Sequence, residues 1–134
     1  MTLTLLFTSM TVASATDGAS FVSYSGVPTS MTPGETATVS VTMRNTGTHA
    51  WTNSATECTQ TYYGLGSQSP ENNTTWGLSR VNLGLNVSVA PNATHTFTFA
   101  ITAPSTTGSY SFQWKMLETE VDEPEPADCF GPFV

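Results

Sequence analysis

The chain has 134 residues, which is enough for one domain of sandwich size and too few for two. Charged residues make up 10% of it, against roughly 25% in an average soluble domain, whereas serine and threonine together make up about 30%. Its net charge is −7, and its three cationic side chains are Arg44, Arg80 and Lys115. Such a chain cannot neutralise a run of phosphates, so we expect no nucleic acid as a partner.

Residues 1–16 are an N-terminal extension that contains a strand-like apolar stretch over residues 2–12. Its large apolar side chains are Leu3, Leu5, Leu6, Phe7, Met10 and Val12. One interpretation is a retained strand that pairs with another copy of the chain. The other is a cleaved signal peptide, because Ala13-Ser14-Ala15 resembles an A-x-A cleavage site, although no Lys or Arg precedes the apolar stretch. The stretch has fewer than 18 uninterrupted apolar residues, so we expect no membrane span.

Residues 17–134 are expected to form one antiparallel β-sandwich. Short strand signals recur between turn residues, and no stretch of ten residues keeps the apolar period of a helix. A first strand over 21–27 follows a linker over 16–19, and Met31-Thr32-Pro33-Gly34 predicts a turn. The clearest half-buried strand comes next, because apolar residues alternate there with Thr and Ser. These apolar residues are Ala37, Val39, Val41 and Met43.

The second half of the domain predicts short strands followed by two long ones. Strands are expected over 49–52, 59–65, 76–83 and 85–89, with a polar loop over 66–75. Two inward rows follow, of which the first is His95, Phe97, Phe99 and Ile101 and the second is Tyr110, Phe112, Trp114 and Met116. We expect a core that contains Val39, Val41, Phe97, Phe99, Ile101, Tyr110, Phe112 and Trp114.

Eight short motifs, in order and at similar spacing, resemble the four-tryptophan Ig-like domain, a module of secreted bacterial proteins and of a eukaryotic autophagy receptor. They are Val39–Gly47, Trp51, Tyr63–Gly66, Trp76-Gly77 with Arg80-Val81, Val89–Pro91, Ala103-Pro104, Gly108–Met116 and Phe130-Gly131. The resemblance covers residues 20–131 and implies an Ig-like sandwich without catalytic function. Cys129 stands where the family has its fourth tryptophan, and the last strand is cut short, so partner binding of the autophagy type is not carried over.

Three further patterns fit an extracellular sandwich. The run Gly108-x-Tyr110-x-Phe112 has the spacing of a tyrosine corner, in which a Tyr hydroxyl bonds to nearby backbone. Cys58 and Cys129 are too few for a zinc site and have no C-x-x-C spacing, so we expect a disulfide and an extracellular or cell-surface location. Two unpaired buried thiols are the alternative. Four sequons are candidate glycosylation sites, at Asn72, Asn73, Asn86 and Asn92.

The sequence shows no arrangement typical of catalysis, and we expect neither an enzyme nor a cofactor. His49 and His95 lie in predicted strands without an Asp or Glu within several residues, although a triad could still assemble in space. The acidic run over 118–128 offers oxygen ligands that could bind Ca²⁺, but its spacing fits no EF-hand loop. A solvated acidic loop is the simpler interpretation, and we predict no metal site.

Five aromatic residues could form a platform on which a sugar stacks. They are Trp51, Tyr62, Tyr63, Trp76 and Trp114. Trp51 and Trp114 match core positions of the family, so core packing is the better interpretation for these two. Tyr62 and Trp76 therefore remain the candidates for contact with a ligand.

These features lead to two main hypotheses about function. In the first, the chain is a structural subunit of an extracellular, pilus-like filament, and residues 2–12 insert as a donor strand beside the short final strand, near Phe133, of the next copy. In the second, residues 1–15 are removed, and the chain is a secreted accessory module that acts as a spacer or as a carbohydrate-binding or adhesion domain. A third arrangement is insertion of the N-terminal strand into the chain's own domain.

Overall fold

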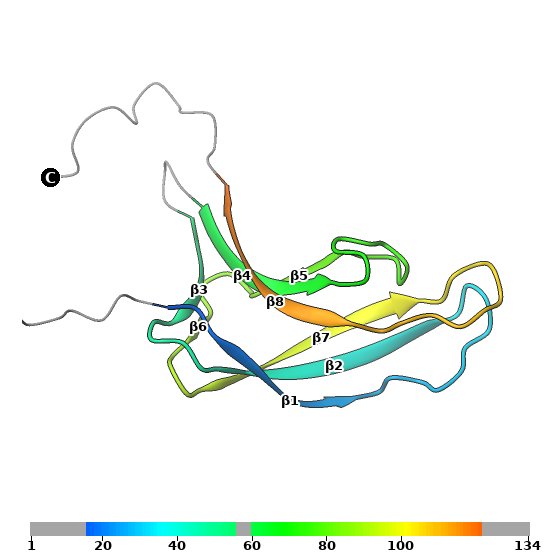
Figure 1. The fold of residues 1–134 in the computed structure, drawn as a ribbon, viewed down its shortest axis with the longest axis horizontal. Helices are drawn as coiled ribbons and strands as arrows, with labels where there is room; N and C mark the ends of the chain where they lie inside the picture. The colour runs from blue at the N-terminus through cyan, green and yellow to red at the C-terminus, as the bar shows by residue number, and fades with distance from the viewer. Residues whose placement is uncertain (1–15, 56–59, 122–134) are drawn as a thin grey trace, which may run out of the picture.

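The computed structural model describes residues 16–55 and 60–121, which form two antiparallel β-sheets (Figure 1). The first sheet has the order β1-β2-β7 and contains β1 (Ala19–Ser25), β2 (Thr36–Asn45) and β7 (Thr94–Thr102). The second contains β3 (Trp51–Ala55), β4 (Gln60–Ser67), β5 (Arg80–Asn82), β6 (Ser88–Val89) and β8 (Trp114–Val121). Its order is β5-β4-β3-β6, with β8 paired to β4. The predicted all-β antiparallel sandwich is confirmed.

Strands β2 and β7 form the centre of the first sheet because apolar and hydroxyl residues alternate along both. Their register places Val39 opposite Phe99 and Val41 opposite Phe97, and all four side chains are buried. They pack against buried residues of the second sheet and its loops. The buried cluster consists of Val39, Val41, Met43, Trp51, Tyr63, Leu65, Leu83, Val89, Phe97, Phe99 and Ile101.

The outer face of the same two strands carries a ladder of paired hydroxyl groups. Ser40 Oγ lies 2.9 Å from Thr98 Oγ1, and Thr42 Oγ1 lies 2.8 Å from Thr96 Oγ1. Each pair consists of residues directly opposite each other in the β2–β7 register. This ladder accounts for part of the high Ser and Thr content, since β-branched Thr suits strands and a hydroxyl pair satisfies both of its partners.

The predicted core is wrong at Tyr110, and two of its other members are buried only in part. Tyr110 is 41% exposed, whereas Phe112 and Trp114 are partly buried against the core. A strand was expected over 110–116, but β8 begins only at Trp114. The reason is that β4 ends at Ser67, and Ser67 is the residue that pairs with Trp114. Residues 110–113 therefore have no neighbouring β4 residues with which to continue the ladder.

Other differences concern the bounds of short elements. The strand expected over 76–83 is limited to β5, and that expected over 85–89 is limited to β6. The expected linker over 16–19 is tied into the first sheet, since Thr46 N donates to Gly18 O at 3.0 Å and Thr48 N donates to Thr16 O at 3.0 Å. These bonds extend the β1–β2 ladder to the first described residue. The predicted turn is present, with a bond from Glu35 N to Thr32 O.

Several predictions fall on residues outside the described part of the chain. They are the strand over 2–12, the disulfide between Cys58 and Cys129, the final strand near Phe133, and the acidic run beyond Val121. These stay predictions. Within the described ranges there is no helix long and apolar enough to cross a membrane.

Candidate functional site

One side of the sandwich is an open groove, and strand β1 forms its first wall. Phe21 is paired with Met43 and Tyr24 with Val41, so both aromatic side chains lie on the inner side of the sheet. An irregularity in the register between Phe21 and Ser23, typical of a β-bulge, brings these two residues to the same face although they are three apart. Phe21 is nevertheless 59% exposed and Tyr24 64% exposed. The described residues therefore leave the space between the sheets in front of β1 uncovered.

The opposite wall is β8, which is an edge strand of the second sheet. It pairs with β4 along its whole length, and no described strand pairs with its other edge. Trp114 and Met116 lie on the inner face, opposite Ser67 and Leu65, yet they are only partly buried. The buried Trp114 Nε1 has no hydrogen-bond acceptor among the described residues. The second wall thus also presents apolar surface and unpaired backbone groups.

Three cavities that share lining residues follow one another along the groove. The central cavity has a volume of about 660 Å³ and lies between Phe21 and Tyr24 on one side and Trp114 on the other. It shares Met43, Trp114 and Lys115 with a cavity of about 320 Å³ near Asp17. At its other end it shares Val27 and Phe112 with a cavity of about 450 Å³. The groove is mainly apolar in its centre.

A polar cluster closes one end of the groove. His49 Nε2 lies 2.8 Å from Asp17 Oδ1 and 2.8 Å from Tyr63 Oη, and Tyr63 Oη lies 2.9 Å from Asp17 Oδ1 and 3.0 Å from Glu118 Oε1. Burial and then hydrogen bonds to the two carboxylates raise the pKa of Tyr63 well above its ordinary value. The phenol is therefore a neutral donor that ties the start of β1 to the second sheet.

This cluster was missed by the sequence reasoning, which looked for acids close to His49 along the chain. Asp17 lies 32 residues before His49 in the sequence. The two residues come together because Asp17 precedes β1, His49 follows β2, and β1 pairs with β2. The partner of this His–Asp pair is the Tyr63 phenol and not a serine or cysteine nucleophile. Among the described residues, no group of three His, Cys, Asp or Glu side chains could hold a metal ion.

Asn45 fixes the loop beside this cluster and explains the Asn45-Thr46-Gly47 motif. Its side chain is fully buried; Nδ2 donates to His49 O at 2.8 Å and to Val89 O at 2.9 Å, and Oδ1 accepts from Gly47 N at 2.9 Å. Gly47 has no room for a Cβ, which would lie 2.5 Å from Thr16 O. The motif thus holds the backbone at the point where the N-terminal segment reaches the domain.

The sandwich and its motifs agree with a comparison against protein families. The model of the family described as the Ig-like domain from next to BRCA1 gene matches residues 26–123. The chain belongs to this Ig-like family. Comparisons with curated proteins and with solved structures give no match.

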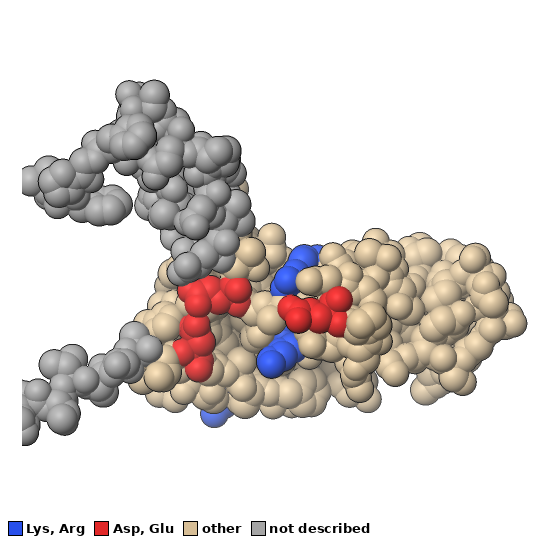
Figure 2. Space-filling view, turned by 45° about the horizontal axis from the view of Figure 1, so that its top comes forward, with Lys and Arg blue, Asp and Glu red and all other residues tan. Residues whose placement is uncertain are grey.

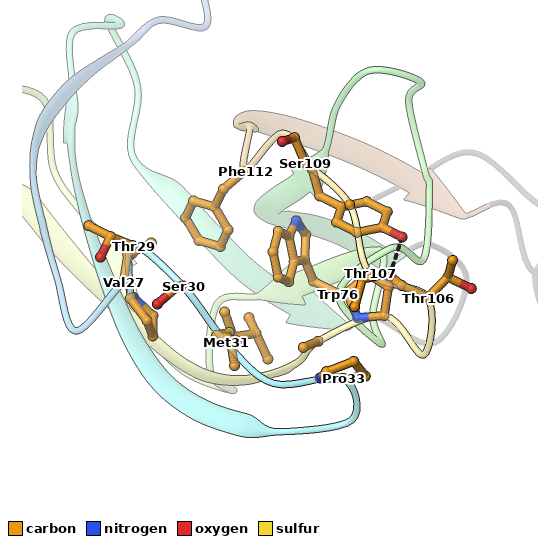
Figure 3. A pocket seen from close by; sticks show the side chains of 16 residues that line it. Val27, Thr29, Ser30, Met31, Pro33, Trp76, Thr106, Thr107, Ser109 and Phe112 are labelled. Atoms are coloured by element: carbon orange, nitrogen blue, oxygen red, sulfur yellow. Dashed lines mark hydrogen bonds between the residues drawn. The ribbon is translucent and has the colours of Figure 1, made fainter.

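At the far end of this Ig-like domain, three aromatic rings gather around the cavity of about 450 Å³ (Figure 3). The ring of Trp76 lies edge-on to Tyr110 and Phe112, with centroids 6.3 and 6.0 Å away. Its Nε1 donates to Ser111 O at 2.9 Å. Tyr110 Oη donates to Thr106 O at 2.6 Å, the dashed line in Figure 3, which confirms the predicted tyrosine corner.

The five aromatic residues considered for a sugar platform do not come together. Trp51 is buried, Tyr63 belongs to the polar cluster, and Trp114 lines the groove. Tyr62 lies on β4 and lines none of the three cavities, whereas Trp76 lines the cavity at the far end. Of the two candidates for ligand contact, only Trp76 therefore stands at a cavity.

The four sequons differ in how free their side chains are. Asn73 Nδ2 donates to Gln68 O at 2.8 Å and to Pro70 O at 2.7 Å, so attachment of a glycan there would remove at least one of these hydrogen bonds. Asn72, Asn86 and Asn92 are exposed and adopt positive φ in turns. These three keep the predicted surface position, and modification of any of them remains a prediction.

Proposed function

We propose that this Ig-like domain is a non-catalytic structural subunit of an extracellular filament and that its groove accepts residues 2–12 of another copy as a donor strand. The observation that supports this proposal best is the exposure of Phe21 and Tyr24, which face the interior of the sandwich yet are more than half exposed. Inward aromatic side chains without a covering layer are typical of a binding groove.

A β-strand is the occupant that this groove fits best. The free edge of β8 offers the backbone donors and acceptors of an eight-residue strand, and β1 is also an edge strand. An incoming extended segment can pair with such an edge while every second side chain enters the apolar space between the sheets. A globular ligand would leave the β8 edge unpaired.

Residues 2–12 have the pattern that such a groove requires. Leu3, Leu5 and Phe7 occupy alternate positions and would lie on one face of an extended strand, while Thr4 and Thr8 would lie on the other. Each large apolar side chain that becomes fully buried contributes about 1.5–3 kcal/mol. Three such side chains, with the backbone pairs, give a gross stabilisation of several kcal/mol before ordering is subtracted.

The end of the β1–β2 ladder favours donation to a second copy. Thr16 and Gly18 are bonded to the loop after β2, so the chain is held in an extended course up to Thr16. To enter its own groove, the strand over 2–12 would have to reverse within residues 13–15. Donation in one direction does not close on itself and therefore produces a fibre. Placement in the secreted bacterial four-tryptophan group, the disulfide and the glycans belong to the same proposal.

The first test changes the donor and the acceptor separately in the full chain. Leu5→Asp would bring a charge into the apolar groove, and Phe21→Asp would place one on its wall, at a cost of several kcal/mol in each case. Both variants should give monomers in size-exclusion chromatography with light scattering and no fibres in electron micrographs. The matched controls, Thr4→Asp and Ser23→Asp, change residues on the opposite faces and should still polymerise.

Mixing the two defective variants identifies the occupant. The Leu5→Asp chain keeps an intact groove and the Phe21→Asp chain keeps an intact donor, so the mixture should give a 1:1 dimer that cannot grow. Two monomers after mixing would show that residues 2–12 do not enter this groove and would overturn the proposal. A monomeric wild-type protein with an intact N-terminus, in which each chain fills its own groove, would also overturn it. So would a wild-type protein that is monomeric and begins after Ala15, which is the result expected of an accessory module with a cleaved signal peptide.

A further inference from the structure

The cavity of about 450 Å³ at the end of the sandwich opposite the polar cluster is built from three loops (Figure 3). The segment 27–33 after β1 forms one side, Trp76 forms the floor, and the segment 103–112 between β7 and β8 forms the other side. Three prolines stand in these walls, at Pro28, Pro33 and Pro104. The volume is within the range of sites that bind small ligands, roughly 300–1,000 Å³.

This cavity is electrically neutral. None of its sixteen lining residues is Asp, Glu, Lys, Arg or His. In Figure 2, charged residues gather over the other half of the visible face, and the end of the domain on the right shows none. Phosphates, carboxylates and amines would lose their hydration there without gaining a charged partner, so a neutral ligand is favoured.

The aromatic side chains of the cavity offer ring surface and not hydrogen-bonding groups. The indole N–H of Trp76 is bonded to Ser111 O, and the Tyr110 hydroxyl is bonded to Thr106 O. The edge-on packing of Trp76 against its two neighbours holds the indole in place. A proline-rich peptide uses aromatic N–H and O–H groups to bind its carbonyls, and these are already occupied.

The free hydrogen-bonding groups are aliphatic hydroxyls on both sides of the rings. They belong to Thr29, Ser30, Thr106, Thr107 and Ser109, all of them exposed. Within the described ranges these hydroxyl groups have no hydrogen-bond partner. Each can both donate and accept, which matches the hydroxyl groups of a sugar, whose C–H face can at the same time stack on an aromatic ring.

From these features we infer that the cavity around Trp76 binds a neutral saccharide, with one hexose unit stacked against Trp76 or Tyr110 and bonded to the hydroxyls of the two loop walls. This site goes beyond the proposed filament function, since a filament subunit needs no sugar ligand. None of its five free hydroxyl-bearing residues lines the central cavity that accepts the donor strand in the proposed function.

The experiment uses the full chain on an array of oligosaccharides, followed by isothermal titration calorimetry of the best binder. The array holds neutral gluco-, galacto-, manno- and fuco-oligosaccharides, N-acetylhexosamine oligomers and their sialylated or sulfated counterparts. We expect binding to a neutral member. Trp76→Leu should lower the affinity about tenfold, and Trp76→Phe, which keeps a ring, should restore part of it.

Two further variants distinguish a loss of ligand contacts from a loss of folding. Ser30→Ala with Thr107→Val removes two exposed hydroxyls that have no partner among the described residues, so the melting temperature should not change while the affinity falls severalfold. Phe21→Ala, in the central groove, should leave the affinity unchanged. The inference is overturned if no neutral saccharide binds, if only charged ones bind, if these variants have no effect, or if decaproline binds at Trp76 and saccharides do not.

Discussion

The closed centre and the open groove of this sandwich are built from the same kind of strand. Val41 and Phe97 in the centre, and Phe21 and Tyr24 in the groove, all face inward in the first sheet. The first two are at most 5% exposed, whereas the other two are more than half exposed. Alternation in a strand thus decides which side a residue faces, but burial requires a second layer opposite. The part of the chain that the structure describes provides no such layer over the groove.

The largest expected difference between the two regions is in the effect of removing an aromatic ring. Phe97→Ala should lower the free energy of unfolding by about 3–5 kcal/mol because it opens a cavity in the closed centre. Phe21→Ala should lower it by less than about 1 kcal/mol, since its ring is largely solvated already. Both are measured by urea titration in the Leu5→Asp background, where the groove has no donor.

This comparison is sharpened by adding a peptide of residues 2–12. If the peptide fills the groove, the stability gained from it should be smaller in the Phe21→Ala variant than in the parent, while Phe97→Ala should leave that gain unchanged. Equal gains in all three proteins would contradict the assignment of Phe21 to the acceptor wall.

The next largest effect is expected at Asn45, which is as buried as the apolar centre. Asn45→Ala leaves the carbonyl groups of His49 and Val89 and the N–H of Gly47 without their partner. We expect a loss of about 3 kcal/mol in the free energy of unfolding. The control Asn82→Ala, at an exposed position of β5, should change it by less than about 0.5 kcal/mol. Similar values for the two variants would show that the buried amide is not essential.

A smaller effect is expected at the polar end of the groove. Tyr63→Phe removes the hydroxyl shared by His49, Asp17 and Glu118, but these groups lie partly in water and can be solvated. We expect a loss of about 1 kcal/mol. Hydrogen exchange should rise at Thr46 and Thr48, whose N–H groups bond to the segment before β1. Unchanged exchange there would mean that the cluster does not hold the start of β1.

The smallest effect concerns pH and His95, which packs edge-on against Phe97 with ring centroids 4.7 Å apart. Burial lowers the pKa of His95 below its ordinary value of 6.5. The unfolded chain therefore binds the proton more readily, so this contribution to stability is complete above pH 6.5 and is lost as the pH falls below it. The decrease in unfolding free energy between pH 7.5 and pH 5 should be larger in the parent than in His95→Gln. An equal decrease would exclude this role.

Much of the fold could be predicted because its signals are local. Alternation at Val39, Val41, Phe97 and Phe99 identifies the central pair of strands, and the spacing of Gly108 and Tyr110 identifies the tyrosine corner. The bounds of the last described strand could not be read in this way. They depend on where β4 ends, at Ser67, and no pattern in residues 110–113 contains that information.

The candidate sites were less accessible to sequence reasoning because they depend on distant residues. His49 meets Asp17 only after the β1–β2 ladder has formed, and the exposure of Tyr24 depends on the absence of a layer and not on its neighbours in sequence. Trp76 was recognised as a candidate, but its partner Tyr110 was assigned to the core. The polar hydroxyls around them are too common in this chain to stand out.

The hydroxyl ladder of β2 and β7 has a consequence for the solution behaviour of the domain. Ser40, Thr98, Thr42 and Thr96 satisfy one another in pairs of neutral hydroxyl groups, and the charged Arg44 follows them on the same face of β2. Dissolved salt screens interactions between charges and leaves bonds between neutral hydroxyls almost unaffected. The two hydroxyl pairs should therefore contribute the same stability in fresh water as in concentrated brine.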